Sequence, residues 1–129
     1  MAKVDKSVLQ FGCESRVRDD TYRRSAKDRA CENCGNPDAV GAHPRTGQTG
    51  GGGLKPGDDL LLFLCTPCHL GPRGQEHGGS RWLARFTLLR ILKLSWPEIE
   101  PTDATCVFVC THILYPILRK RYAAWVTKQ

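Results

Sequence analysis

The apolar positions of the chain fall into two short runs followed by two longer ones. Residues 39–43 (AVGAH) and 59–64 (DLLLFL) are short and bounded by turn residues, which predicts two strands, the second of them buried. Residues 80–94 begin with a serine suited to an N-cap and then follow helical spacing, and residues 104–126 form a second helical region. Pro116 lies inside that region, where we expect a kink or a break. The pattern predicts an α+β protein.

Polar residues dominate two other stretches. Residues 15–30 (SRVRDDTYRRSAKDRA) predict a short helix with exposed arginines, either a basic arm for phosphates or an ordinary solvated helix. The density of arginine favours the arm, because a guanidinium grips phosphate in a bidentate fork. Residues 44–58 are rich in glycine and proline and predict a loop.

The 129 residues suit one compact domain in three parts. These are a basic lead (1–30), a cysteine-histidine core (31–79) and a helical extension (80–129). The longest apolar runs are too short to span a membrane, and the N-terminus lacks the features of a signal peptide, so we expect a cytoplasmic protein. In a reducing compartment clustered cysteines more often bind metal than form disulfides.

The net charge of +6 is unevenly distributed. Residues 1–30 carry +3 and residues 81–129 carry +5, whereas residues 31–80 carry −2. An excess of this size fits a polyanionic partner, nucleic acid first, or simply keeps the protein soluble. If DNA is the partner, the flanks should supply most of its non-specific affinity.

Four cysteines have the spacing of metal ligands. Cys31 and Cys34 form one C-x2-C pair, and Cys65 and Cys68 form a second after thirty intervening residues. A two-residue gap lets both sulfurs of one turn reach the same ion, and four thiolates complete the tetrahedron that Zn²⁺ prefers. The sequence therefore predicts a structural zinc site, with chance spacing or a redox dithiol as the alternative.

Three histidines lie in or just after the cysteine region. His43 ends the first predicted strand, His69 directly follows the last cysteine of the second pair, and His77 follows after seven intervening residues. If the cysteines pin these elements side by side, the imidazoles of His43 and His69 face one cleft. A structural zinc site does not need them, so they indicate chemistry.

Together these features resemble a known motif. The pattern C-x2-C, AH-x-R-T-G, GGGGLKPGDD, LC-x2-CH and a final H is similar to the HNH endonuclease motif. The ββα-metal fold of that family is often braced by a four-cysteine zinc site. Phage- and prophage-encoded HNH proteins, including the Ref-type recombination nucleases, also resemble this chain in RDDTYRR, LKP-x-D and HGGSRW. The resemblance covers residues 18–83.

The resemblance implies roles for individual residues. His43 would be the general base that takes a proton from the attacking water. His69 would bind a catalytic divalent cation, Mg²⁺ or another, with His77 as a second ligand. Asp58 would take the middle position of the motif, where a side chain orients the histidine strand or holds the loop, and Asp59 could substitute. Arg45 would neutralise the scissile phosphate.

The chain departs from the family pattern before His43. Many relatives have paired histidines where this chain has Ala42 and His43. If the missing histidine is the metal ligand, the ion is bound more weakly or by another group. If His43 is itself the ligand, the general base is unassigned. Aspartate at position 58 also adds a negative charge near the phosphate, unless a cation offsets it.

The predicted function is metal-dependent hydrolysis of DNA phosphodiester bonds that leaves a 3′ hydroxyl, in phage-related DNA processing or recombination. Its partners would be DNA and a recombination or phage DNA-processing protein; the oligomeric state is open. The first alternative is a catalytically inactive, zinc-stapled nucleic-acid-binding module. The second is a protein-interaction adaptor that uses the helical tail.

Three further groups have simpler explanations. Residues 106–112 (C-x3-C-x-H) lie in an apolar helical stretch, where the cysteines are better read as small buried hydrophobes than as ligands. Trp82, Phe86 and Leu89 form an apolar stripe that predicts core rather than a base-stacking platform. Residues 119–121 form a short basic run, either a DNA contact or a solvated face.

Overall fold

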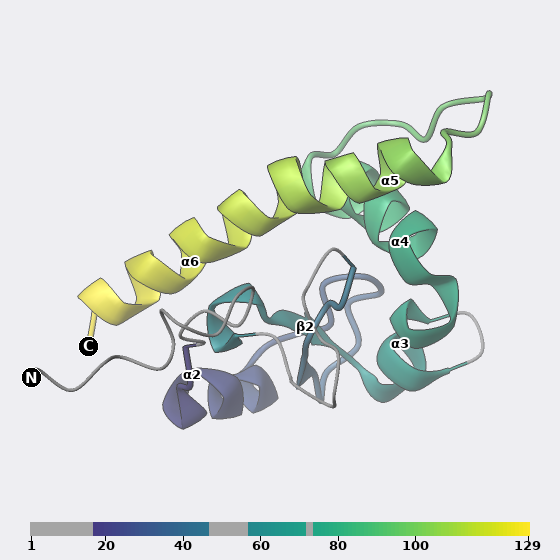
Figure 1. The fold of residues 1–129 in the computed structure, drawn as a ribbon. Coiled ribbons are helices and arrows are strands. Elements are labelled where there is room, and N and C mark those ends of the chain that lie inside the picture. The colour runs from purple at the N-terminus through teal and green to yellow at the C-terminus, as the bar shows by residue number, and fades with distance from the viewer. Residues whose placement is uncertain (1–16, 47–56, 72–73) are drawn as a thin grey trace, which may run out of the picture.

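A small antiparallel sheet forms the centre of the chain (Figure 1). The computed structural model describes residues 17–46, 57–71 and 74–129, with the backbone alone for 75–77. Strand β1 (Val40–Ala42) pairs with β2 (Leu62–Leu64), so that Val40 faces Leu64 and Ala42 faces Leu62. Both strands fall within the segments that the hydrophobic pattern predicts, and the α+β class is confirmed.

Short helices flank the sheet. Helix α2 (Asp20–Arg24) begins where the Asp19 side chain accepts a hydrogen bond from the Tyr22 amide at 2.9 Å, and it continues as the 3₁₀ turn η1 (Ser25–Asp28). A second 3₁₀ turn, η3 (Asp58–Leu60), leads into β2. Helix α3 (Thr66–Leu70) follows β2 directly, and a proline in its first turn suits a helix start.

The C-terminal half is helical, as predicted. Helix α4 (Gln75–Phe86) bends at Gly79, whose φ of 58° is tolerated by glycine, and it passes into the π-helical segment η4 (Thr87–Ile91). Helix α5 (Asp103–Val109), the π-helical segment η5 (Cys110–Leu114) and α6 (Tyr115–Thr127) follow one another along one long coil (Figure 1).

The expected break at Pro116 is not found. The backbone around it stays in the right-handed helical region, from Val109 through Leu114 to Tyr115. Proline cannot donate the backbone hydrogen bond of a helix interior. The chain has already widened into the π-helical η5 before the proline, and this local change of hydrogen-bond pattern accommodates the missing donor inside a continuous helix.

The apolar run before α3 is buried on both sides. Leu62 and Leu64 belong to a core with α4 and the α5–α6 coil, whereas Leu61 and Phe63 pack with α2, Tyr122 and Trp125. Alternate residues of a strand point to opposite faces, so a strand covered on both faces reads as continuous apolar sequence. The α5–α6 coil contributes to both clusters, so the helical extension packs on the sheet.

None of the described helices is both long enough and apolar enough to cross a bilayer.

Candidate functional site

The four cysteines converge on one point. Their sulfur atoms all lie within 4.8 Å of one another, and Cys34 Sγ lies 3.5 Å from Cys65 Sγ. Zn–S bonds of about 2.3 Å in a tetrahedron would separate the sulfurs by about 3.8 Å, whereas a disulfide requires about 2.05 Å. All four are free thiols. The cluster can hold a structural metal ion such as zinc.

Backbone geometry brings the thiols together. The first pair sits in a tight turn that Gly35 closes with φ 83° and a hydrogen bond from its amide to the Cys31 carbonyl at 2.8 Å. The second pair spans the step from β2 into α3, with Cys65 at the N-cap. The cluster thus ties the loop before β1 to the start of α3.

The electrostatics of the cluster favour a cation. Burial tends to raise the pKa of Cys31, but hydrogen bonds from the backbone amides of Cys65, Cys34 and Asn33 outweigh it and lower that pKa to about 7. Burial raises the pKa of Cys65. Burial also raises the pKa of Cys68 to about 12, although the Asn33 amide donates to its sulfur at 3.4 Å. Four thiolates here would need a positive ion to offset their charge.

Glu32, between the first two cysteines, joins this turn to the rest of the fold. It exchanges hydrogen bonds with the Phe63 backbone, 2.9 Å from its amide to the carbonyl and 2.7 Å from the Phe63 amide to its carboxylate. Arg121 of α6 forms an ion pair with this carboxylate and donates to the Leu61 carbonyl at 2.8 Å. Burial tends to lower the pKa of Arg121, but its bonds to Glu32 raise it.

The basic run of residues 119–121 therefore divides. Arg121 is a structural clamp, with its side chain only 27% exposed. Arg119 is exposed and its Nε lies 3.7 Å from the Asp59 carboxylate, and Lys120 is exposed. Neither of the two interpretations, a DNA contact or a solvated face, therefore fits all of residues 119–121.

His43 and Asp58, predicted from opposite ends of a long loop, lie in contact. His43 directly follows β1, and its Nε2 lies 2.7 Å from Asp58 Oδ1. The side chain of His43 is 15% exposed and that of Asp58 is 4% exposed. The buried carboxylate holds the imidazole in one orientation through Nε2.

A second layer of hydrogen bonds holds Asp58. Its Oδ2 accepts the Asp19 amide at 2.7 Å, and its own amide donates to the Val17 carbonyl at 2.8 Å. The Asp19 carboxylate accepts the Tyr122 hydroxyl at 2.8 Å. Burial and this carboxylate raise the pKa of Tyr122 to about 12, which keeps the phenol protonated as a donor.

Asp19 and Tyr122 were not singled out by the sequence. They are separated by 103 residues; Asp19 lies in the RDDTYRR stretch, but the resemblance assigned it no role, and Tyr122 lies outside the resemblance. The chain of contacts nonetheless runs from α6 through Asp19 to Asp58 and His43. Asp19 is an ordinary helix N-cap and Tyr122 an ordinary helical residue in the sequence, so neither indicates the contact between them.

The remaining predicted residues have different surroundings. Arg45 is exposed two residues after His43, and Asp59 is half-buried beside Arg119. His69 is half-buried on α3. His77 lies in α4, with its side chain outside the described residues, as is most of the glycine-rich loop.

Among the side chains that the structure describes, which leave out those of residues 75–77, the four cysteines are the only group of three or more metal-ligating side chains that converge. The catalytic cation site at His69 and His77 therefore stays a prediction. The other histidine-cysteine group is not a site: Cys106 and Cys110 are fully buried, and His112 is exposed against the Phe108 ring at 4.5 Å. The reading of these cysteines as small buried hydrophobes is confirmed.

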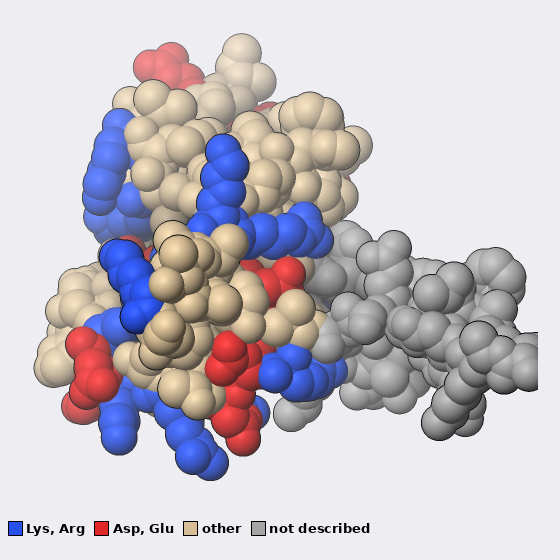
Figure 2. All heavy atoms as spheres, turned by 90° about the vertical axis from the view of Figure 1, so that its left-hand side faces the viewer, with Lys and Arg blue, Asp and Glu red and all other residues tan. Residues whose placement is uncertain are grey.

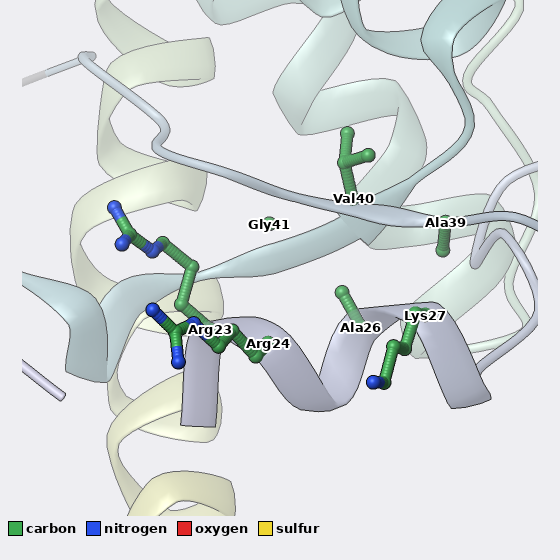
Figure 3. Close-up of a pocket in the computed structure, with 7 residues that line it drawn as sticks. All are labelled: Arg23, Arg24, Ala26, Lys27, Ala39, Val40 and Gly41. Atoms are coloured by element: carbon green, nitrogen blue, oxygen red, sulfur yellow. The ribbon is translucent and has the colours of Figure 1, made fainter. Parts of the chain in front are cut away.

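A basic groove of about 390 Å³ lies between α2–η1 and β1 (Figure 3). Arg23 and Arg24 project from α2 at one end of the groove, with one of the two side chains reaching up to the strand, and Lys27 projects from the following turn away from the strand. A Cβ at Gly41 would lie 3.0 Å from Arg23 Cγ, so glycine lets the arginine stem rest on the strand. This strand ends at His43.

The charge around the groove is mixed. Asp20 pairs with Arg23 at 2.5 Å and lies 3.9 Å from Arg24. Arg29, by contrast, packs on the core, with its Cζ 4.2 Å from the centre of the Phe63 ring. On the face that carries the ends of α2 and α6, basic and acidic side chains alternate (Figure 2). On this face an anion would therefore be held locally, in the groove, because acidic side chains interrupt the positive charge around it.

No protein-family model, curated protein or solved structure matches this chain. The motif resemblance and the geometry described above are therefore the basis for any functional proposal.

Proposed function

We propose that this chain is a metal-dependent endonuclease of the HNH type that hydrolyses DNA phosphodiester bonds. The observation that carries the proposal is the 2.7 Å contact between His43, at the end of β1, and the buried Asp58. The order of elements adds support, because an antiparallel strand pair leads directly into a helix that bears His69. The four cysteines brace this arrangement.

His43 would act as the general base. Asp58 would hold the ring through Nε2 while the imidazole takes a proton from the water that attacks phosphorus. The Asp58 carboxylate stabilises the imidazolium that results, as a carboxylate does for other catalytic histidines. This pairing also answers the concern about a negative charge at position 58, because the charge is directed at the imidazole and at the Asp19 amide.

His69 and His77 would hold the catalytic cation. Two imidazole ligands suit nickel, zinc or another transition metal better than magnesium, which prefers oxygen. A bound cation would polarise the phosphoryl oxygens and stabilise the leaving 3′ oxygen. Arg45, exposed two residues after His43, would contact the phosphate.

The DNA backbone would lie along the groove beside β1. Arg23, Arg24 and Lys27 supply positive charge next to the strand that leads to His43. Phosphate contacts of this kind fix the register of the substrate without reading its sequence. The acidic middle of the chain makes such a contact outside the cysteine region necessary for affinity.

The test is cleavage of supercoiled plasmid by the zinc-loaded protein with magnesium, manganese or nickel. We expect nicking or linearisation with at least one cation, and a loss of about 10²-fold or more in rate for His43→Ala. His112→Ala is the matched control, since His112 is exposed on another element. Absence of cleavage with every cation, or equal rates in the two variants, would contradict the proposal.

A second candidate is a zinc-stapled nucleic-acid-binding module without catalysis. It is supported by the cysteine cluster and by the basic groove beside β1, neither of which requires chemistry at His43. This function predicts DNA binding without cleavage under every condition above. A protein-interaction adaptor that uses the helical extension would show neither DNA binding nor cleavage.

A further inference from the structure

A second pocket, of about 470 Å³, lies between the first cysteine turn and α4–η4. It is lined by Asn33, Trp82, Arg85, Phe86, Leu89 and Arg90. The apolar stripe in this set was expected to be core. Phe86 is indeed buried, but Trp82 and Leu89 are only half-buried and open onto the pocket. The aromatic stripe is thus partly a surface.

The aromatic wall of the pocket is flat. The rings of Trp82 and Phe86 stack with centroids 5.3 Å apart and planes only 8° from parallel. Phe86 fixes the orientation of the indole from the buried side. A planar ligand can extend such a stack, and nucleobases do so on exposed aromatic side chains in a largely sequence-independent way.

The rim of the pocket is positively charged. Arg85 and Arg90 are exposed, no acidic residue lines the pocket, and neither arginine forms an ion pair with a carboxylate of the described residues. Arg81 on the same helix behaves differently, because it is paired with Glu100 at 2.8 Å and with Asp103 at 3.1 Å. The pocket therefore matches an anionic ligand, and paired donors of this kind suit phosphate.

Asn33 adds a polar group to the wall. Its amide nitrogen donates to Cys68 Sγ at 3.4 Å, which fixes the side chain to the cysteine cluster. Within the part of the chain that the structure describes, Asn33 Oδ1 accepts no hydrogen bond. The oxygen can accept one from the amino group of a base.

We propose that this pocket binds an unpaired nucleotide of a nucleic-acid strand. The base stacks against Trp82, and Arg85 and Arg90 neutralise the flanking phosphates. The volume falls within the usual range for small-ligand pockets. The choice of a nucleotide over an acidic peptide with an aromatic side chain rests on the proposed function.

The test measures binding without cleavage. A fluorescently labelled single strand and an abasic strand of equal length are titrated with the zinc-loaded protein, with no other divalent cation, and followed by anisotropy. We expect the normal strand to bind about fivefold or more tightly than the abasic one. Trp82→Ala should remove this preference, with circular dichroism and zinc content as the check on folding.

The phosphate contacts are tested with a matched pair of variants. Arg85→Glu/Arg90→Glu and Lys120→Glu/Lys128→Glu change the net charge equally, and all four residues are exposed. The first double variant should lose about tenfold more affinity for the single strand than the second. Because all four side chains are exposed, this comparison holds even if Trp82→Ala fails to fold.

Three results would overturn the proposal: no preference for the strand that contains bases, equal losses in the two double variants, or tight binding of an acidic aromatic peptide that competes with the strand. The nuclease proposal is judged separately by plasmid cleavage. Plasmid cleavage without a preference for the strand that contains bases would overturn only the pocket assignment. A preference for that strand without plasmid cleavage would overturn only the nuclease proposal.

Discussion

Asp58 is placed so that its charge acts on one imidazole. Both of its oxygens are engaged, Oδ1 by His43 and Oδ2 by the Asp19 amide, each at 2.7 Å. Asp19 is in turn held by the Tyr122 hydroxyl. We therefore regard Tyr122 as a positioning residue for His43, acting through two intermediates.

Tyr122→Phe tests this role. Loss of the hydroxyl leaves the Asp19 carboxylate with one donor fewer, and we expect stability to fall by about 1 kcal/mol in urea unfolding. If Asp58 and His43 shift with Asp19, the cleavage rate should fall and its pH profile should move. Thr87→Val is the control, because it removes the buried hydrogen bond from Thr87 to the Leu83 carbonyl away from the site. A pH profile that is unchanged in Tyr122→Phe would reduce Tyr122 to a purely structural role.

At the residue scale the motif resemblance singled out His43 and Asp58, and the fold brings them into contact. It could not supply Asp19 or Tyr122, because their contact depends on how α6 crosses the sheet. Local sequence carries no information on a contact across 103 residues. The predicted pairing of His69 with His77 is untested by the described residues.

At the scale of elements, the cysteine cluster holds segments together, as a larger hydrophobic core does in bigger proteins. It joins the loop before β1 to the start of α3, two segments that share only a short sheet. Metal that binds the folded protein alone adds its binding free energy to stability.

Removal of the metal should therefore unfold this region. We expect a strong chelator to release about one zinc per chain and to lower the midpoint of thermal unfolding by more than about 10 °C. Cys65→Ser should do the same, whereas Cys106→Ser, a buried thiol outside the cluster, should retain zinc. A chain that holds no zinc, or one whose unfolding is insensitive to the chelator, would contradict the assignment.

The α6 helix is expected to stabilise the same turn through Arg121. Arg121→Ala leaves the Glu32 carboxylate, only 17% exposed, without its ion-pair partner, and should cost about 1–3 kcal/mol in urea unfolding. Lys120→Ala removes an exposed neighbour and should change stability by less than about 0.5 kcal/mol. Equal effects would show that the Arg121–Glu32 contact is energetically unimportant.

Element boundaries were predictable where the pattern was simple. The two strands and the two helical regions follow from periodicity. The continuous passage through Pro116 did not, because it depends on the π-helical segment before the proline. The half-exposed face of Trp82 was also missed, because a stripe at helical spacing does not reveal how much of it a neighbouring element covers.

For the molecule as a whole, the distribution of charge sets where a polyanion can lie. The groove between α2–η1 and β1 places Arg23 and Arg24 beside the strand that His43 follows. Each phosphate contact that is lost should reduce the salt dependence of binding in proportion.

Arg23→Gln/Arg24→Gln should therefore flatten the plot of log affinity for duplex DNA against log salt concentration by about 2. Lys120→Gln/Lys128→Gln changes the charge by the same amount at residues that do not line the groove and should leave the slope nearly unchanged. Identical slopes in the two double variants would argue against the groove as the path of the DNA backbone.

The central claim is that His43 is the base that activates water, and chemical rescue tests it most directly. Cleavage of plasmid by His43→Ala is measured with and without added imidazole, and wild-type protein with imidazole controls for effects on the metal. The account predicts a strongly reduced rate that imidazole restores in part, increasingly as pH rises and the neutral form accumulates. A His43→Ala protein that cleaves as fast as wild type, or that imidazole leaves inactive while wild type is unaffected, would contradict it.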